Sequence, residues 1–190
     1  NSIQNLPITL ESIQEQTYAP VEVIIVDGGS TDGTVALIRQ FADNSGLEVK
    51  WISEPDDGLY DAMNKAYRMS TGDIIAVCND RLSEKESIAV FVEAIRKAGE
   101  DCIGAHSDLI YVEGNKQIRG WHMGEGDIRQ GWMPGHPALY LKREVYEKYG
   151  LYDTAYRCAA DYEFMVRFLK DRTNRLAYVP RVLITMFYGG

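Results

Sequence analysis

The fold is decided by residues 23–34, which read Val23-Ile24-Ile25-Val26-Asp27-Gly28-Gly29-Ser30-Thr31-Asp32-Gly33-Thr34. The four apolar residues at its start are typical of a strand that is buried on both faces of a parallel sheet. Asp27 then lies at the carboxyl end of that strand, where open α/β sheets bind their ligands. Gly28 and Gly29 allow positive φ and a close approach of the backbone to a ligand.

The pattern alone leaves two interpretations of this turn open. It could be an ordinary βα turn, because Ser30, Thr31 or Asp32 can cap the helix that we expect over residues 34–42. It could also be a ligand site. The turn is neither a Gly-x-Gly-x-x-Gly dinucleotide fingerprint nor a phosphate-binding loop with Gly-Lys-Ser/Thr. Asp27 is better suited to accept hydrogen bonds from a base or a ribose.

Composition limits the class of protein. The 190 residues are enough for one domain with a substantial core. The net charge of −8 argues against nonspecific nucleic-acid binding, which needs a basic face. No apolar run approaches the roughly 20 residues of a membrane-spanning helix. The three cysteines are scattered and form no Cys-x-x-Cys, which predicts free thiols in a reducing compartment, hence a cytoplasmic protein.

Strand and helix patterns alternate through the first half of the chain, which favours βαβ units and a largely parallel sheet. We expect strands over 23–26, 49–52 and 74–78, and helices over 34–42, 59–69 and 82–99. A capping-box pattern at Ser83 and Glu86 supports the start of the last helix. The second half predicts antiparallel strands, with a hairpin at residues 113–116.

Several polar residues follow predicted strands or open predicted helices, and each has a plain structural alternative. Asp56 and Asp57 could form a metal site or a solvated turn. Asn64 could fix a turn or contact a nucleotide. His136 lies in a loop with two prolines, where it could contact an acceptor or make a structural hydrogen bond. Asp161 could serve as a helix cap or as a general base.

Four segments of the chain, taken in order, resemble the family-two glycosyltransferases of the GT-A fold. They are DGGSTDGT at 27–34, EPDDGLYDAMNKA at 54–66, TGDIIAV at 71–77 and AADYE at 159–163. The second segment is most similar to that of bacterial members that build surface polysaccharides.

This resemblance implies a Rossmann-like mixed α/β sheet, mainly parallel and flanked by helices, with a small antiparallel portion on the acceptor side. We expect a single domain over 1–190, with a nucleotide-binding half at about 1–100 and an acceptor half at about 101–190. The resemblance also leads us to expect a β-strand before residue 1. The chain would then be a fragment that lacks its first strand.

The resemblance implies an inverting glycosyltransferase that moves a sugar from a nucleotide diphosphate, a UDP-sugar, to a hydroxyl of a glycan or lipid-linked glycan. It assigns the nucleotide to Asp27, Asp57 and Asn64, and a divalent cation, Mg²⁺ or Mn²⁺, to Asp80. It makes Asp161 the catalytic base. Glu163 and His136 would contact or support the acceptor.

One departure from the family pattern concerns the cation. Related enzymes present two acidic residues where this chain has Asn79-Asp80-Arg81. Asp80 could act with neighbours, Arg81 could replace part of the cation's charge, or residues could be missing between Asn79 and Leu82. Asp80 could also be a plain turn residue. Two other functions therefore stay open: a noncatalytic nucleotide-sugar-binding module, which this departure favours, and a nucleotidyltransferase, which would need a basic phosphate loop.

Four arginines near the carboxyl end suggest peripheral contact with the inner face of a membrane. They are Arg167, Arg172, Arg175 and Arg181. A solvated face is the alternative.

Overall fold

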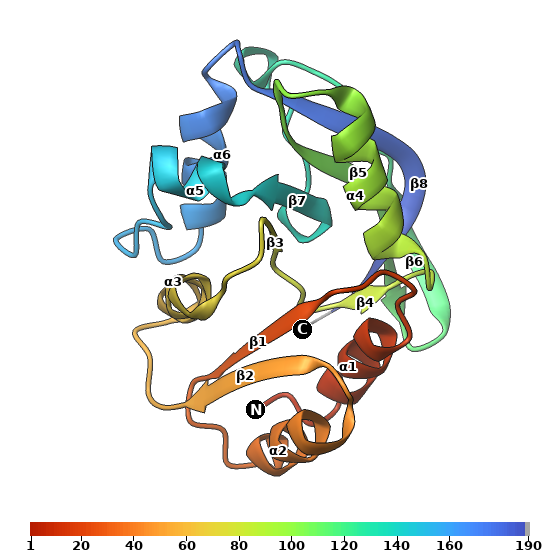
Figure 1. Ribbon diagram of the computed structural model, residues 1–190, viewed down its shortest axis with the longest axis vertical. Helices are drawn as coiled ribbons and strands as arrows, with labels where there is room; N and C mark the ends of the chain where they lie inside the picture. The colour runs from red at the N-terminus through yellow and green to blue at the C-terminus, as the bar shows by residue number, and fades with distance from the viewer. Residues whose placement is uncertain (189–190) are drawn as a thin grey trace.

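The structure is a computed structural model that describes residues 1–188. It contains two β-sheets with helices packed against them (Figure 1). In chain order the elements are α1 (Leu6–Gln14), β1 (Glu22–Asp27), α2 (Thr34–Asn44), β2 (Glu48–Ser53), α3 (Leu59–Met69), β3 (Ile74–Ala76), β4 (Arg81–Leu82), α4 (Ser87–Ala98), β5 (Cys102–Glu113), β6 (Lys116–Trp121), η1 (Ile128–Gln130), η2 (His136–Ala138), β7 (Leu139–Lys142), α5 (Arg143–Tyr149), α6 (Ala160–Leu169) and β8 (Arg175–Phe187).

The smaller sheet consists of β1 and β2, which run parallel with Asp27 beside Ser53 in the register. Within residues 1–188, β1 has no other strand partner, and Ile24–Val26 are only half-buried. The expectation of a strand buried on both faces is therefore wrong. Helices α1 and α2 pack with this pair in a cluster that contains Leu10 of α1, Val23 of β1 and Phe41 of α2.

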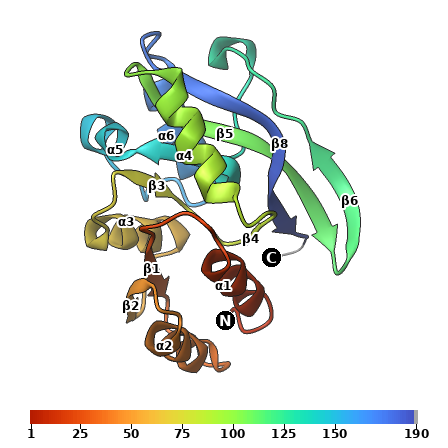
Figure 2. The ribbon, with the colours of Figure 1, turned by 45° about the vertical axis from the view of Figure 1, so that its right-hand side comes forward.

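The larger sheet has the strand order β3-β7-β5-β8-β4, and β6 pairs with β5 to one side of this path. Only the β5–β8 pair is parallel among the described pairs of this sheet, whereas β7, β6 and β4 pair antiparallel with their neighbours. The fold is mixed α/β as expected, but the sheet is not mainly parallel. Figure 2 shows β5, β6 and β8 curling together at one side of the molecule.

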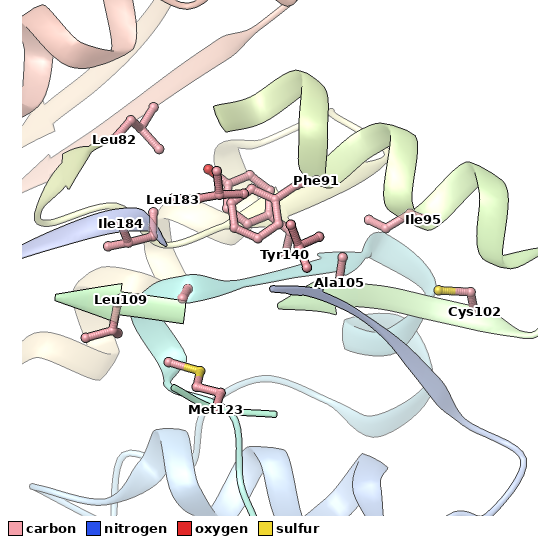
Figure 3. Close-up of a cluster of buried hydrophobic side chains, with 12 residues drawn as sticks. Leu82, Phe91, Ile95, Cys102, Ala105, Leu109, Met123, Tyr140, Leu183 and Ile184 are labelled. Atoms are coloured by element: carbon pink, nitrogen blue, oxygen red, sulfur yellow. The ribbon is translucent and has the colours of Figure 1, made fainter. Parts of the chain in front are cut away.

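Helices cover both faces of the larger sheet. Helix α4 lies over one face, where the Phe91 ring stacks on Tyr140 with centroids 3.9 Å apart (Figure 3). The other face packs against α5 and α6, whose Val145 and Phe164 contact Leu139 of β7. Alternate residues of β7 thus serve both clusters, as the period of two in a strand requires.

The start of α4 differs from the prediction. The helix begins at Ser87 and not at Leu82, because Arg81 and Leu82 pair with β8 as the short strand β4. The Ser83 hydroxyl lies 2.8 Å from that of Thr185, so it is not available as a helix cap. A long-range strand pairing here overrides a local helix signal.

No helix in residues 1–188 has the length and apolar character needed to cross a bilayer.

Candidate active site

The turn after β1 is built around the Asp27 carboxylate, which is 6% exposed. Its Oδ2 accepts hydrogen bonds from the backbone N–H of Gly29 (3.0 Å) and Ser30 (2.9 Å) and from the Ser53 hydroxyl (2.7 Å). Burial opposes the charge, but the hydrogen bonds from Ser30, Ser53 and Gly29 prevail and hold the pKa of Asp27 below its usual value. The carboxylate therefore fixes the turn and joins the ends of β1 and β2.

The second loop, residues 54–58, lies against this turn. Its backbone joins β1 where the Glu54 N–H donates to the Asp27 carbonyl (3.0 Å). The Asp56 carboxylate packs beside Gly28, where a Cβ would stand 2.5 Å from Asp56 Oδ2. Asp57, the residue assigned to the nucleotide, is exposed, and its N–H donates to Asp61 Oδ2 (3.2 Å). Asp56 is thus the acidic residue of this loop that contacts the first turn.

Helix α3 carries Asn64 on a buried face. Its amide donates to the Tyr152 carbonyl (2.9 Å), and its Oδ1 accepts from the Tyr152 N–H (3.0 Å). Both ends of the side chain therefore bind the backbone of one residue. Of the two interpretations, the geometry favours the structural one, in which Asn64 fixes the segment before α6.

Three side chains from separate parts of the chain, Tyr60, His136 and Tyr152, converge around Asp161 at the start of α6. The Tyr60 hydroxyl of α3 donates to Asp161 Oδ1 (2.8 Å). His136 Nε2 lies 2.7 Å from the Tyr152 hydroxyl, and the Tyr152 ring packs on that of Tyr60 with centroids 5.7 Å apart. Figure 1 shows α3 between the carboxyl ends of β1 and β2 and the helices α5 and α6.

Burial sets the charge states of two members of this group. It lowers the pKa of His136 below its usual value, although the nearby Asp161 charge opposes the shift. Burial likewise raises the pKa of Tyr152 well above its usual value. At neutral pH the phenol is therefore protonated and the imidazole is neutral. Such a pair offers hydrogen-bond donors and acceptors to a ligand without adding a second charge beside Asp161.

Glu163 faces a different partner. Its carboxylate pairs with Arg167 one turn along α6 (2.9 Å). The Arg167 guanidinium also donates to the carbonyls of Tyr149 and Leu151, the latter at 2.6 Å. Glu163 thus orients the Arg167 guanidinium, which binds the carbonyls of Tyr149 and Leu151 and so forms a clamp on the α5–α6 connection. This ion pair gives Glu163 a structural role that does not involve an acceptor.

The turn at Asp80 supplies one carboxylate. Asp80 Oδ1 accepts from the Phe187 N–H (3.1 Å), and burial raises the pKa of Asp80 above its usual value. No three His, Cys, Asp or Glu side chains within residues 1–188 come together as metal ligands. Asp80 is therefore a single carboxylate at the turn where the family resemblance implies a divalent cation.

The four carboxyl-terminal arginines do not form one patch. Arg167 is committed to the clamp, and Arg181 pairs with Glu84. Arg172 and Arg175 are exposed and remain as the support for a membrane contact.

The sequence did not assign a site role to three of these residues. They are Tyr60 and Tyr152 near Asp161, and Asp56, which contacts the Asp27 turn. Tyr60 had a usable signal, because it lies four residues before Asn64 and hence on the same helix face. Tyr152 had none, since it lies in a connection and is brought in by long-range packing. Asp56 was indistinguishable from Asp57 by pattern.

The chain is similar to known proteins in both sequence and fold. The family model described as "Glycosyl transferase family 2" matches residues 1–165. A PGL/p-HBAD biosynthesis glycosyltransferase of Mycobacterium bovis is 32% identical over 170 residues, which cover 85% of this chain and 63% of the relative. An uncharacterized glycosyltransferase of Mycobacterium tuberculosis, Rv1514c, is 32% identical over 178 residues, 88% of this chain and 64% of the relative. The chain thus spans about 63% of the length of the first curated relatives that it matches.

Solved structures share the fold. The crystal structure of S. aureus TarS 1–349 superposes with a TM-score of 0.77 at 16% identity, over 98% of this chain and 58% of TarS. The same protein in complex with UDP-GlcNAc gives a TM-score of 0.80 at 16% identity, over 100% of this chain and 56% of TarS. At this identity the likeness concerns the fold alone, whereas the family model covers most of the chain. The chain belongs to glycosyl transferase family 2.

Proposed function

We propose that this protein is an inverting glycosyltransferase, which moves a sugar from a UDP-sugar to a hydroxyl of a glycan or lipid-linked glycan. One observation carries the proposal. Asp161, at the start of α6, accepts a hydrogen bond from Tyr60 of α3. Helix α3 follows directly after the second loop, residues 54–58, which packs against the Asp27 turn. A carboxylate that can take a proton is thus tied to a turn suited to a nucleotide.

The donor side rests on Asp27, Asp56 and Asp57. The Asp27 carboxylate shapes the turn through its Oδ2, and the exposed Asp57 and the glycines offer groups to a base or ribose. TarS, which shares the fold, binds UDP-GlcNAc, and this supports a uridine nucleotide for the present chain.

The reaction is a single displacement at the anomeric carbon. The acceptor oxygen forms a bond to that carbon while the bond to the diphosphate oxygen breaks, so the configuration inverts. The hydroxyl proton passes to Asp161, because a sugar hydroxyl is a poor nucleophile until its proton begins to leave. The products are the glycoside and the nucleoside diphosphate. Neutral His136, which hydrogen-bonds to the Tyr152 hydroxyl, would form a hydrogen bond with the acceptor.

The proposal includes a divalent cation that would bind together with the donor, and its effect is measured by comparing UDP affinity with and without Mn²⁺. Asp80 is the side chain that would accompany the donor's diphosphate, since Mg²⁺ is often bound through one or two carboxylates and substrate phosphates. When bound, the cation would neutralise negative charge on the departing diphosphate.

The test is the substitution Asp161→Asn. We expect transfer from UDP-sugars to fall by at least about 100-fold, because a positioned base contributes that much or more. UDP affinity, measured by calorimetric titration with and without Mn²⁺, should remain within about twofold of the wild type. Glu144→Gln, which removes an exposed carboxylate from the first turn of α5, is the matched control.

The competing function is a noncatalytic nucleotide-sugar-binding module. The single carboxylate at Asp80, bound by the Phe187 N–H, is the observation that favours it. UDP-sugar binding by the wild-type protein without transfer to any acceptor would establish this alternative. Retained transfer by Asp161→Asn would instead remove Asp161 from the mechanism.

A further inference from the structure

Tyr60 and Asn64 lie one turn apart on α3 and reach different parts of the same site. The Tyr60 hydroxyl donates to Asp161 Oδ1 (2.8 Å), and Asn64 holds the Tyr152 backbone at both its N–H and its carbonyl. Residues four apart share a helix face, so the two contacts act together. One face of α3 therefore fixes the direction of the proposed base and the position of Tyr152.

The start of α3 is in turn fixed to the donor loop. Asp61 Oδ2 accepts from the Asp57 N–H (3.2 Å). Lys65 donates to the Pro55 carbonyl (3.2 Å) and pairs with Glu54 (2.9 Å). These contacts hold the loop on the first two turns of the helix. Tyr60 lies in the first of these turns, so the contacts that hold the loop on α3 also restrict the position of its hydroxyl relative to Asp161.

The Tyr60 hydroxyl can act only as a donor to a carboxylate. Burial raises the pKa of Tyr60, and the hydrogen bond to Asp161 raises it further, so the phenol stays protonated at neutral pH. A hydrogen bond to the charged form of an acid favours that form. The titratable groups that face Asp161 from neighbouring elements are Tyr60, His136 and Tyr152, while Glu163 on its own helix pairs with Arg167.

We propose that Tyr60 is a positioning residue for transfer, because its hydroxyl orients Asp161 and favours the carboxylate that takes the acceptor proton. This inference rests on the proposed function, in which Asp161 is the base. Tyr60 does not itself exchange a proton with the substrate.

The test is Tyr60→Phe, which keeps the ring and removes the hydroxyl. We expect kcat to fall on the order of tenfold to a hundredfold, as for loss of one hydrogen bond to a charged group. The acidic limb of the kcat/KM profile should move to higher pH, because the carboxylate loses a hydrogen-bond donor. UDP affinity should stay within about twofold, since the hydroxyl that is removed contacts Asp161 and not the Asp27 turn.

Tyr67→Phe is the matched control. Tyr67 lies on the same helix about 10 Å further along its axis, and its ring packs on Tyr146. Its pH profile should coincide with that of the wild type. A second variant, Tyr60→3-fluorotyrosine, keeps the packing and makes the phenol more acidic, so the same limb should move to lower pH. The 3-fluorotyrosine variant tests the role of the Tyr60 hydroxyl even if the Tyr60→Phe protein does not fold.

An acidic limb that stays in place in both Tyr60 variants would overturn the inference, whatever happens to kcat, because a purely structural role does not move it. This failure differs from failure of the proposed function. If Asp161→Asn keeps its activity, the base assignment itself fails. If Asp161→Asn is inactive while both Tyr60 variants keep the wild-type profile, only the role of Tyr60 fails.

Discussion

Asp27 contributes a charge that the fold both buries and satisfies. One carboxylate oxygen accepts three hydrogen bonds, two from the backbone of its own turn and one from Ser53 of the neighbouring strand. Hydrogen bonds to a charged group are worth more than neutral ones, and an unsatisfied buried carboxylate is costly. The residue is therefore as important to the shape of the turn as to any ligand.

We expect Asp27→Asn to lower the free energy of unfolding at pH 7 by about 1–3 kcal/mol, because the hydrogen bonds to a charged oxygen become neutral ones. The folded-state pKa of Asp27 lies below its unfolded value, so the unfolded chain binds more protons near pH 4. The stabilisation is thus present above about pH 4 and is lost as the pH falls through the folded pKa.

Urea unfolding between pH 2.5 and pH 7 measures this effect. The stability gap between wild type and Asp27→Asn should narrow toward the acidic end. Asp43→Asn, at an exposed position of α2, controls for loss of a surface carboxylate. A gap that is constant across the range would contradict the charged hydrogen bonds described for Asp27.

The loops that follow β1 and β2 contact each other at Gly28 and Asp56. A Cβ on Gly28 would stand 2.5 Å from Asp56 Oδ2, which is closer than ordinary contacts allow. Asp56 cannot move freely, because its Oδ1 accepts from the Gly58 N–H (2.9 Å). The absence of a side chain at residue 28 is thus what lets the two loops pack.

Gly28→Ala should push the Asp56 side chain away and disturb the loop that leads into α3. We expect UDP affinity to fall on the order of tenfold, about 1.4 kcal/mol, with little change in the melting temperature. Gly72→Ala is the matched control, since its Cβ would lie 3.6 Å from the Ile74 carbonyl, an ordinary contact. Equal UDP affinity in the two variants, measured by calorimetry, would show that the loop contact does not shape the nucleotide site.

The whole molecule is held together by packing on the two faces of the larger sheet. On one face Phe91 of α4 is fully buried against Tyr140 and Leu183 (Figure 3). On the other face Phe164 of α6 packs near Tyr152 and so connects the core to the site. Stability and site geometry therefore share the same sheet.

Phe91→Ala should lower the free energy of unfolding by about 3–5 kcal/mol, through lost burial and the cavity that remains. Ile118→Ala on β6, where the side chain is 39% exposed, should change it by less than about 1 kcal/mol. Urea denaturation of both variants is the measurement. A small effect of Phe91→Ala would mean that α4 is not an essential cover of the sheet.

The sequence alone determined the local elements and the chemistry at their ends. The apolar run that ends at Asp27, the helix over 59–69 and the helix that opens before Asp161 all agree with the structure within a few residues. Each depends on periodicity, on glycine punctuation or on a helix start, and these act over a few neighbouring residues. The family was also evident, because four segments occur in the right order.

The long-range partners of these elements and side chains could be learned from the tertiary structure only. Arg81 and Leu82 become a strand by pairing with β8, about a hundred residues away. The Tyr60 hydroxyl binds Asp161, and the Asn64 amide binds the backbone of Tyr152, each across about ninety residues or more of chain. Local pattern cannot determine such partners, because a carboxylate or an amide has the same propensity whichever distant group it binds. Packing of the sheet and its helices selects the partner: it brings Tyr60 of α3 to Asp161, whereas Glu163 pairs with Arg167 within its own helix.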